Sequence, residues 1–90
     1  MVVLGTHTPV PTADVAVLPG GTAYTSDVGM TGAKESVIGF DRQAILGLFL
    51  GNKLPGLGVS RGSAALNAVL IKVDAESWRA TGIERVVKAP

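Results

Sequence analysis

The sequence predicts an α/β fold in which mostly antiparallel strands accompany one clear helix. Short apolar runs rich in β-branched residues are separated by turns that contain glycine and proline. One denser apolar segment, residues 41–50, begins at an aspartate and is followed by a glycine, as helices often are. A long apolar run at residues 64–73 is the strongest strand. The resulting order of strand, hairpin, helix and hairpin is typical of a small α/β or α+β domain.

The first expected element is a short buried strand at residues 2–4, where three apolar residues follow one another. It leads into a loop over residues 5–14, in which Pro9 and Pro11 stiffen the chain and exclude a helix. The sequence opens directly inside this strand, without the basic segment or cleavage site of a secretory signal. Such a start looks more like a cut within a domain than like a natural beginning.

A β-hairpin is expected over residues 15–28. Apolar and β-branched stretches flank the Pro-Gly-Gly turn at 19–21, in which proline fixes φ and glycine permits a positive φ. The glycine pair could also be taken for a phosphate-binding loop. Because neither a helix start nor a lysine follows it, a turn is favoured. Residues 29–32 then break the strand pattern, and residues 33–39 indicate irregular structure.

The clearest helix spans residues 41–50. Asp41 is a good N-cap, because its carboxylate can accept the free N–H groups of the first turn. Phe40 and Ile45 occupy the two positions of a hydrophobic staple, and Gly51 provides the C-terminal stop. Apolar side chains cover most of the circumference of this helix, so it needs cover on more than one side.

The second half of the chain is expected to contain a loop and two further strands. The loop occupies residues 52–58, and residues 57–60 are a candidate for a short strand. Residues 64–73 place apolar side chains on both faces, which suits a central strand covered on both sides. A polar connection at 74–81 is followed by the last strand at 82–87.

The composition is that of a small, folded and unusually apolar chain. Hydrophobic residues make up 47% of the 90 residues and charged ones 17%, which argues against disorder and leaves more apolar surface than one small domain readily hides. The net charge is +1, so neither nucleic acid nor a membrane is an expected partner. Trp78 is expected to cover apolar surface as a lid, since a single aromatic is no nucleic-acid platform. The apolar surplus predicts a partner, either a missing N-terminal region or a second copy in a homo-oligomer.

The absence of cysteine excludes disulfides, thiolate catalysis and zinc-ribbon sites. No apolar run approaches the roughly 18 residues that a helix needs to cross a bilayer. Both features are compatible with the cytosol, and a cytoplasmic location is therefore expected.

His7 is the single histidine and the first candidate functional residue. It follows the first strand, so that the strand can fix the backbone while the loop presents the imidazole to a metal or a substrate. The alternative is a loop histidine that makes a hydrogen bond and binds no metal. Asp14 and Asp27 are candidates for the rim of an active site. The alternatives are a turn carboxylate bonded to backbone amides for Asp14 and a structural role at a strand end for Asp27.

Several stretches of the chain closely resemble the C-terminal third of the YmdB-like metallophosphoesterases, which belong to the calcineurin-like superfamily. The matching stretches are Gly-Thr-His-Thr-Pro-Val-Pro-Thr-Ala-Asp at 5–14, Leu-Pro-Gly-Gly-Thr-Ala-Tyr-Thr-Ser-Asp-Val-Gly-Met-Thr-Gly at 18–32, Ser-Val-Ile-Gly at 36–39 and Leu-Asn-Ala-Val-Leu-Ile at 66–71. The resemblance implies that residues 1–90 are a single-domain piece, the C-terminal part of a calcineurin-like sandwich.

The resemblance also implies a phosphodiesterase that acts on cyclic nucleotides or related phosphodiesters through a pair of divalent metals, usually iron or manganese. Most metal ligands of such enzymes come from the N-terminal two thirds. The last ligand motif of the family reads Gly-Thr-His-Thr-His. Its first histidine falls on His7, and its second falls on Pro9, which has no lone pair to offer a metal. No catalytic residue is identified in this chain, and we expect it to be inactive alone.

Two other hypotheses remain open. The chain could be a non-catalytic module that associates with itself through the apolar residues of 41–50 and 64–73. It could also be a truncated reading frame without an independent role. An upstream continuation of the reading frame that carries Asp, Glu, Asn and His at strand ends would identify the chain as a fragment of the enzyme.

Overall fold

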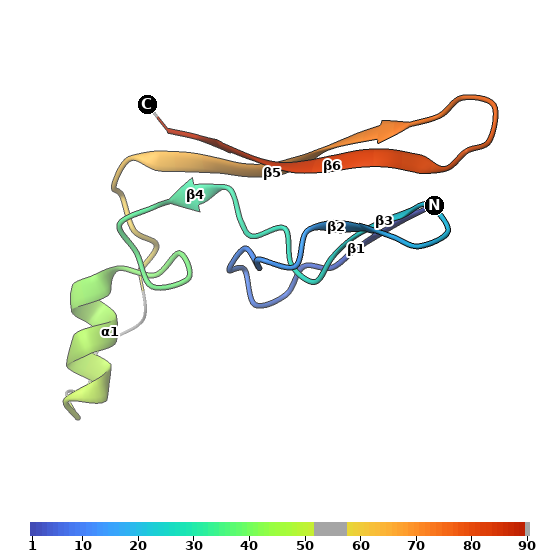
Figure 1. Cartoon of the computed structure of the whole chain (residues 1–90). Coiled ribbons are helices and arrows are strands. Elements are labelled where there is room, and N and C mark those ends of the chain that lie inside the picture. The colour runs from blue at the N-terminus through green and yellow to red at the C-terminus, as the bar shows by residue number, and fades with distance from the viewer. Residues whose placement is uncertain (52–57, 90) are drawn as a thin grey trace.

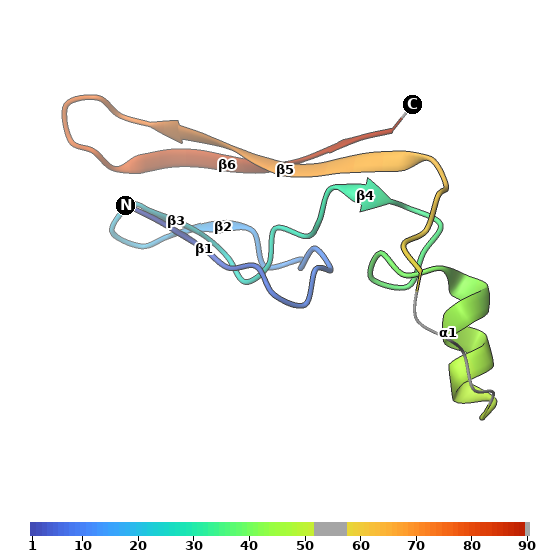
Figure 2. The same ribbon diagram turned by 180° about the vertical axis from the view of Figure 1, so that it is seen from behind.

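The computed structural model describes residues 1–51 and 58–89 of the chain. In chain order, the elements of this part are β1 (Val2–Leu4), β2 (Ala16–Leu18), β3 (Thr22–Thr25), β4 (Gly32–Ala33), α1 (Arg42–Phe49), β5 (Ala64–Val73) and β6 (Ala80–Lys88). The long β5–β6 ribbon lies above the small sheet of β1, β2 and β3, and α1 lies at one end of the molecule (Figures 1 and 2). The predicted combination of mostly antiparallel strands with one helix is confirmed.

The first sheet has the strand order β1-β3-β2. Strands β2 and β3 pair in antiparallel register, with Leu18 opposite Thr22, which confirms the predicted hairpin. Gly20 and Gly21 have φ angles of 98° and 89°, values that favour glycine, and the amide of Gly21 donates to the carbonyl of Leu18 at 3.0 Å. Strand β1 pairs with β3 in parallel, so this sheet is mixed.

The second sheet has the order β4-β5-β6, and all its pairs are antiparallel. Strand β5 has the predicted bounds and is the central strand of this sheet. Strand β4 was not predicted, since a two-residue strand shows no periodicity in the sequence. It exists because Gly32 and Ala33 lie in register with Ala65 and Ala64 of β5.

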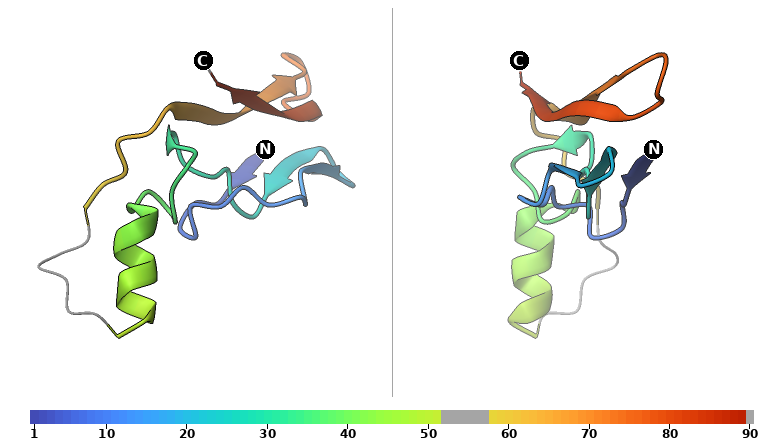
Figure 3. Two further views of the ribbon diagram at one scale, coloured as in Figure 1. Left: turned by 90° about the vertical axis from the view of Figure 1, so that its left-hand side faces the viewer. Right: turned by 45° about the vertical axis from the view of Figure 1, so that its right-hand side comes forward.

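Helix α1 begins after Asp41, whose carboxylate accepts a hydrogen bond from the amide of Ala44 at 3.0 Å. The predicted N-cap is thus confirmed. Gly51, at φ 85°, follows the last turn of the helix. Ile45 is buried, but Leu46, Leu48, Phe49 and Leu50 are exposed. Two rotated views show that α1 projects away from both sheets (Figure 3).

The described residues form almost no apolar core. The buried apolar residues are Ala23, Ile45, Ala65 and Ala80, three of which are alanines. The radius of gyration is 17.0 Å, whereas a compact chain of this length has about 12 Å. The accessible surface is 6326 Å², whereas a compact monomer of 9.2 kDa exposes about 4,900 Å². The chain is therefore an extended, open piece of structure.

Three predictions about burial are wrong for this reason. Strand β1 was expected to be buried, but Val2, Val3 and Leu4 are 41–45% exposed. Strand β5 was expected to be covered on both sides, yet several of its large apolar residues are exposed. Trp78, which was expected to lie over apolar surface as a lid, is 72% exposed. The described elements are too few to place a layer on each side of each sheet.

The predicted loop at 52–58 lies almost entirely outside the described residues. Of the candidate strand at 57–60, Val59 forms an isolated bridge with Phe40, and Leu57 lies outside the described residues. Within the described ranges, no helix has both the length and the apolar character to span a bilayer.

Gly5 joins β1 to the loop that carries His7, and its lack of a side chain permits a close approach. Its amide donates to the carbonyl of Thr25 at 3.0 Å, and its carbonyl accepts from the amide of Val28 at 3.0 Å. A Cβ atom built at Gly5 would overlap the backbone carbonyl of Ser26. The end of β1 can therefore lie against the end of β3 only with glycine at this position.

We predict that Gly5→Ala destabilises the chain by about 1–3 kcal/mol, the usual cost of forcing extra atoms into a filled space. Urea unfolding measures this change. Gly58→Ala is the matched control, because a Cβ atom there meets nothing within 4 Å. Equal stability of the two variants would contradict the close approach at Gly5.

Candidate functional site

The candidate site is the loop between β1 and β2, which carries His7. The side chain of His7 is exposed, and its backbone amide donates to a carboxylate oxygen of Asp27 at 3.0 Å. The loop is therefore fixed through its backbone while the imidazole is free to face solvent. This is the arrangement that the position of His7 after a strand predicts.

Asp27 is the residue that fixes the loop. It is 3% exposed, and its Oδ2 accepts hydrogen bonds from the amides of His7 and Thr8 and from the hydroxyl of Thr8, at 3.0, 2.8 and 2.6 Å. Its Oδ1 accepts from the amide of Gly29 at 2.8 Å. The hydroxyl of Thr8, followed by the amide of Gly29, holds the pKa of Asp27 below its ordinary value. Asp27 thus lies beneath the loop, with both oxygens engaged by the protein.

Asp14 makes a second set of hydrogen bonds at the other end of the loop. Its carboxylate accepts from the hydroxyl and the amide of Ser26, the latter at 3.0 Å, and from the hydroxyl of Thr12 at 2.6 Å. These bonds, led by the one from the Ser26 hydroxyl, hold the pKa of Asp14 far below its ordinary value. Asp14 thus ties the end of the loop to Ser26, which directly follows β3.

Thr12 links the two carboxylates, a role that the sequence analysis missed. Its amide donates to the carbonyl of Asp27 at 3.1 Å, and its hydroxyl oxygen accepts from the amide of Asp27 at 3.0 Å. Thr8 was missed in the same way. The available signal was the occurrence of threonine and aspartate together in a proline-containing loop, where side chains commonly bond to nearby backbone.

The donor chemistry of the loop fits one metal ligand and no more. Among the described residues, no three His, Cys, Asp or Glu side chains lie close enough to hold a metal ion. The oxygens of Asp14 and Asp27 already accept several hydrogen bonds each. The imidazole of His7 is the remaining donor suited to a transition metal. A complete metal site requires ligands from elsewhere.

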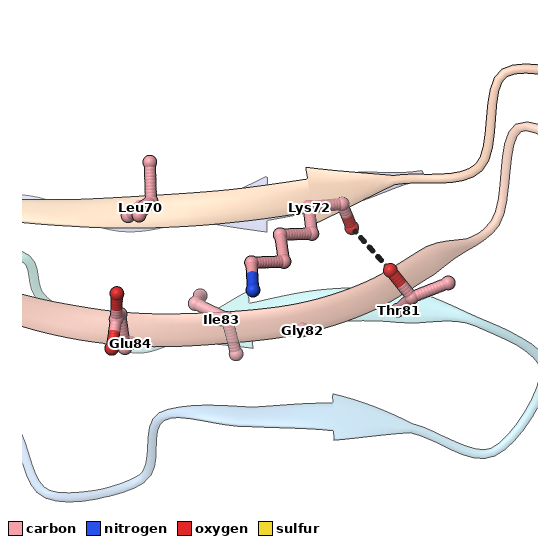
Figure 4. Close-up of a pocket in the computed structure, with 6 residues that line it drawn as sticks. All are labelled: Leu70, Lys72, Thr81, Gly82, Ile83 and Glu84. Atoms are coloured by element: carbon pink, nitrogen blue, oxygen red, sulfur yellow. Dashed lines mark hydrogen bonds between the residues drawn. The ribbon is translucent and has the colours of Figure 1, made fainter.

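Among the hollows of the described surface, two have well-defined lining residues. One, of about 480 Å³, adjoins the loop and is lined in part by Pro9, Val10 and Pro11. The other, of about 200 Å³, lies on the β5–β6 ribbon, where the hydroxyl of Thr81 donates to the carbonyl of Lys72 at 3.3 Å (Figure 4). The second hollow is formed by a single hairpin, and neither hollow is lined by His7, Asp14 or Asp27.

Comparison with known proteins finds one family over nearly the whole chain. The sequence model of the YmdB-like protein family matches residues 1–86. The chain is 44% identical over 85 residues to a 2′,3′-cyclic-nucleotide 2′-phosphodiesterase of Bacillus subtilis (strain 168), covering 94% of this chain and 32% of the relative. It is 38% identical to a putative phosphatase/phosphodiesterase of Mycoplasma pneumoniae, covering 93% of this chain and 30% of that protein.

Solved structures with the same fold are also about three times longer than this chain. A crystal structure of a novel phosphatase from Mycoplasma pneumoniae aligns with a TM-score of 0.89 at 36% identity, over 98% of this chain and 32% of that one. A hypothetical protein from Thermus thermophilus aligns with a TM-score of 0.84 at 39% identity, over 98% of this chain and 34% of that one. The chain thus spans about a third of the relatives that it matches.

We predict that acid destabilises the chain through Asp27. Its pKa is lowered in the folded state, so its contribution is fully present above the unfolded pKa of about 3.9 and is lost as the pH falls below it. Urea unfolding between pH 7 and pH 2 should show constant stability above about pH 5 and a decline below about pH 4.

The variant Asp27→Asn should be less stable at pH 7, because an amide group would face the amide donors of the loop. Its stability should also decline less in acid, because asparagine has no carboxylate to protonate. Glu84→Gln is the control, since Glu84 lies on the exposed part of β6. A decline in acid that is the same in Asp27→Asn and in the unmodified chain would contradict this role of Asp27.

Proposed function

Because this chain belongs to the YmdB-like protein family, we propose that it forms the C-terminal portion of a metal-dependent phosphodiesterase that acts on cyclic nucleotides or related phosphodiesters. The observation that carries the proposal is the exposed imidazole of His7 on a loop whose backbone is held by the buried Asp27. The activity for which the Bacillus subtilis relative is named supports the choice of substrate class.

The proposal has two further parts: that the chain belongs to the calcineurin-like superfamily, and that the protein is located in the cytoplasm. The first is supported by the two small sheets that lie one above the other (Figure 1) and by the fold shared with a crystallised phosphatase. The second is supported by the absence of cysteine from the sequence.

His7 would hold one ion of a divalent pair, iron or manganese, through an imidazole nitrogen. Such a pair, when bound, polarises the phosphoryl oxygens and makes a bound water a nucleophile at neutral pH. The hydrogen bonds described above fix the backbone from which the imidazole extends. Asp27 orders residues 7 and 8 through their backbone amides. The conformational entropy of this loop segment is therefore lost when the protein folds and not when the substrate reacts.

Pro9 sets a limit on the metal site of this chain. It stands where the family motif has its second histidine, and it offers no lone pair to a metal. Asp14 and Asp27 accept hydrogen bonds within the loop, and no three described His, Cys, Asp or Glu side chains lie close enough to hold a metal ion. The remaining ligands are proposed to come from the part of the relatives that lies outside the matched third.

We predict that the isolated 90-residue chain shows no His7-dependent binding of Mn²⁺. One imidazole alone cannot hold a metal pair. Calorimetric titration of the chain with Mn²⁺, with His7→Ala as the control, measures this. Tight binding that disappears in His7→Ala would show that the 90 residues assemble a site on their own.

We predict that turnover appears when the chain replaces the matching third of the Bacillus subtilis relative. In that fusion, His7→Ala should reduce hydrolysis of a 2′,3′-cyclic nucleotide by more than about 100-fold, since even groups behind the ligands commonly contribute about 10- to 100-fold. Pro9→His should raise the affinity for metal, and Glu84→Gln should change neither quantity. Unchanged turnover in His7→Ala would refute the role of His7.

A second candidate function is that of a non-catalytic module that associates with itself. The observation in its favour is the apolar end of α1, where Phe49 and Leu50 are 80% and 79% exposed. Sedimentation at micromolar concentration should then show a dimer or larger assembly that Phe49→Ser weakens. A stable monomer over this range would exclude the self-associating module. A truncated reading frame without a role would show neither self-association nor turnover in the fusion.

A further inference from the structure

We propose that the hollow of about 480 Å³ beside the loop between β1 and β2 binds the nucleobase of a cyclic nucleotide, with Ile38 as an apolar wall and Asn67 as the hydrogen-bond partner of the base. Its volume lies in the range of about 300–1,000 Å³ that is usual for ligand pockets. The inference rests on the proposed function, because the Bacillus subtilis relative is named for its action on 2′,3′-cyclic nucleotides. It adds the place of the base and the bases that fit best.

One wall of the hollow, residues 9–11, belongs to the loop that carries His7. A Cβ atom built at Gly29 would lie 2.8 Å from Cδ of Pro11, so the proline ring packs directly on the Gly29 backbone. The amide of Gly29 donates to Oδ1 of Asp27 at 2.8 Å, and Oδ2 of Asp27 accepts from the amide of His7 at 3.0 Å. One carboxylate therefore holds both this wall and the backbone of the proposed metal ligand. The wall begins two residues after His7, which is about 7 Å of backbone, a span that one nucleotide can bridge.

A second wall is a tight turn in which Ile38 has a strained backbone. Ile38 and Gly39 have φ angles of 45° and 93°, and Val37 and Phe40 exchange two backbone hydrogen bonds at 3.0 and 2.9 Å. A turn of this type prefers asparagine before the glycine, and a β-branched residue is unfavourable there. Ile38 is 50% exposed, so packing within the described chain does not account for an isoleucine at this position. Backbone strain of this kind is common at sites that hold a ligand.

Asn67 supplies the polar group of the hollow. Its Nδ2 donates to the carbonyl of Met30 at 2.7 Å, and the Cε of Met30 lies 2.9 Å from where a Cβ atom of Gly32 would be. Met30 is thus packed against a glycine, and its carbonyl fixes the side-chain amide of Asn67. This leaves Oδ1 of Asn67 as the acceptor that is available to a ligand. An amide oxygen suits the exocyclic amino group of cytosine or adenine, whereas uracil has a carbonyl in place of the amino group of cytosine.

The charge and polarity of the lining favour a nucleotide over an apolar segment of protein. Among the described residues that line the hollow, Lys34 is charged and none is a carboxylate, while most of the others are apolar. A flat base gains free energy by leaving water for such a surface, and an ammonium group nearby attracts the phosphate of the same nucleotide. An apolar protein segment would instead cover Oδ1 of Asn67 without giving it a donor, which costs free energy.

Binding of nucleosides tests the subsite without metal or turnover. Cytidine and uridine are the probes, since they differ at the amino group and lack the phosphate that a metal would bind. In NMR titrations of the 90-residue chain and of the fusion with the Bacillus subtilis relative, cytidine should shift the signals of the Ile38 methyl groups and of the Asn67 side-chain amide. It should bind about 5-fold more tightly than uridine, because one hydrogen bond distinguishes the two. Equal affinities, or the absence of shifts at both residues, would overturn the proposal.

Ile38→Asn separates the loss of the apolar wall from a loss of folding. Asparagine followed by glycine is the preferred sequence for this turn, so the variant should melt no lower than the unmodified chain. Its affinity for cytidine should nevertheless fall about 5-fold, because the apolar contact is gone. Leu70→Asn is the matched control, since Leu70 is 51% exposed and lines the other hollow. An equal loss of affinity in both variants, or a lower melting temperature of Ile38→Asn, would overturn the role of Ile38.

Kinetics of the fusion distinguish the subsite from the proposed activity. Ile38→Asn should raise KM for 2′,3′-cyclic cytidine monophosphate about 5-fold and change kcat less than about 2-fold, because the wall holds the base and not the reacting phosphate. Turnover with an unchanged KM would support the activity and overturn the subsite, and would indicate that the rest of the domain fills the hollow. Binding of cytidine that depends on Ile38, in a fusion without turnover, would support the subsite while the proposed activity fails.

Discussion

The buried carboxylate of Asp27 is the interaction on which the local order of this chain depends. It accepts four hydrogen bonds, three from residues 7 and 8 and one from residue 29. A carboxylate with several amide and hydroxyl donors stays ionised and holds them in one geometry. The loop between β1 and β2 consequently has a defined path although almost no apolar core lies beneath it.

This polar order contrasts with the apolar packing of the rest of the chain. The buried apolar residues are mostly alanines, and the larger aliphatic side chains on β1, β5 and α1 remain partly exposed. Hydrophobic burial is usually the dominant stabilising contribution to a fold. The strands and the helix of this chain therefore depend more on backbone pairing and helix capping than the elements of a compact domain do. Main-chain pairing and side-chain hydrogen bonds fix the shape of the elements, while the layers that would cover them are missing from the described part.

The local elements were predictable because their signals are local. The glycine turn of the hairpin, the aspartate cap of α1 and the apolar run of β5 each specify structure within a few residues. The short strand β4 and the parallel pairing of β1 with β3 were not predictable. Both depend on partners that are more than fifteen residues away in the chain, and neither leaves a periodic pattern.

The sequence by itself determined the β2–β3 hairpin, α1, β5 and the family to which the chain belongs, and it predicted His7 as the candidate ligand. Only the tertiary structure decided what the two aspartates do, since hydrogen bonds between distant loops are set by the path of the backbone and not by composition. It also decided that apolar strands are exposed. Apolar residues indicate which surfaces need cover, but burial requires a second layer, and that layer is a property of the assembled fold.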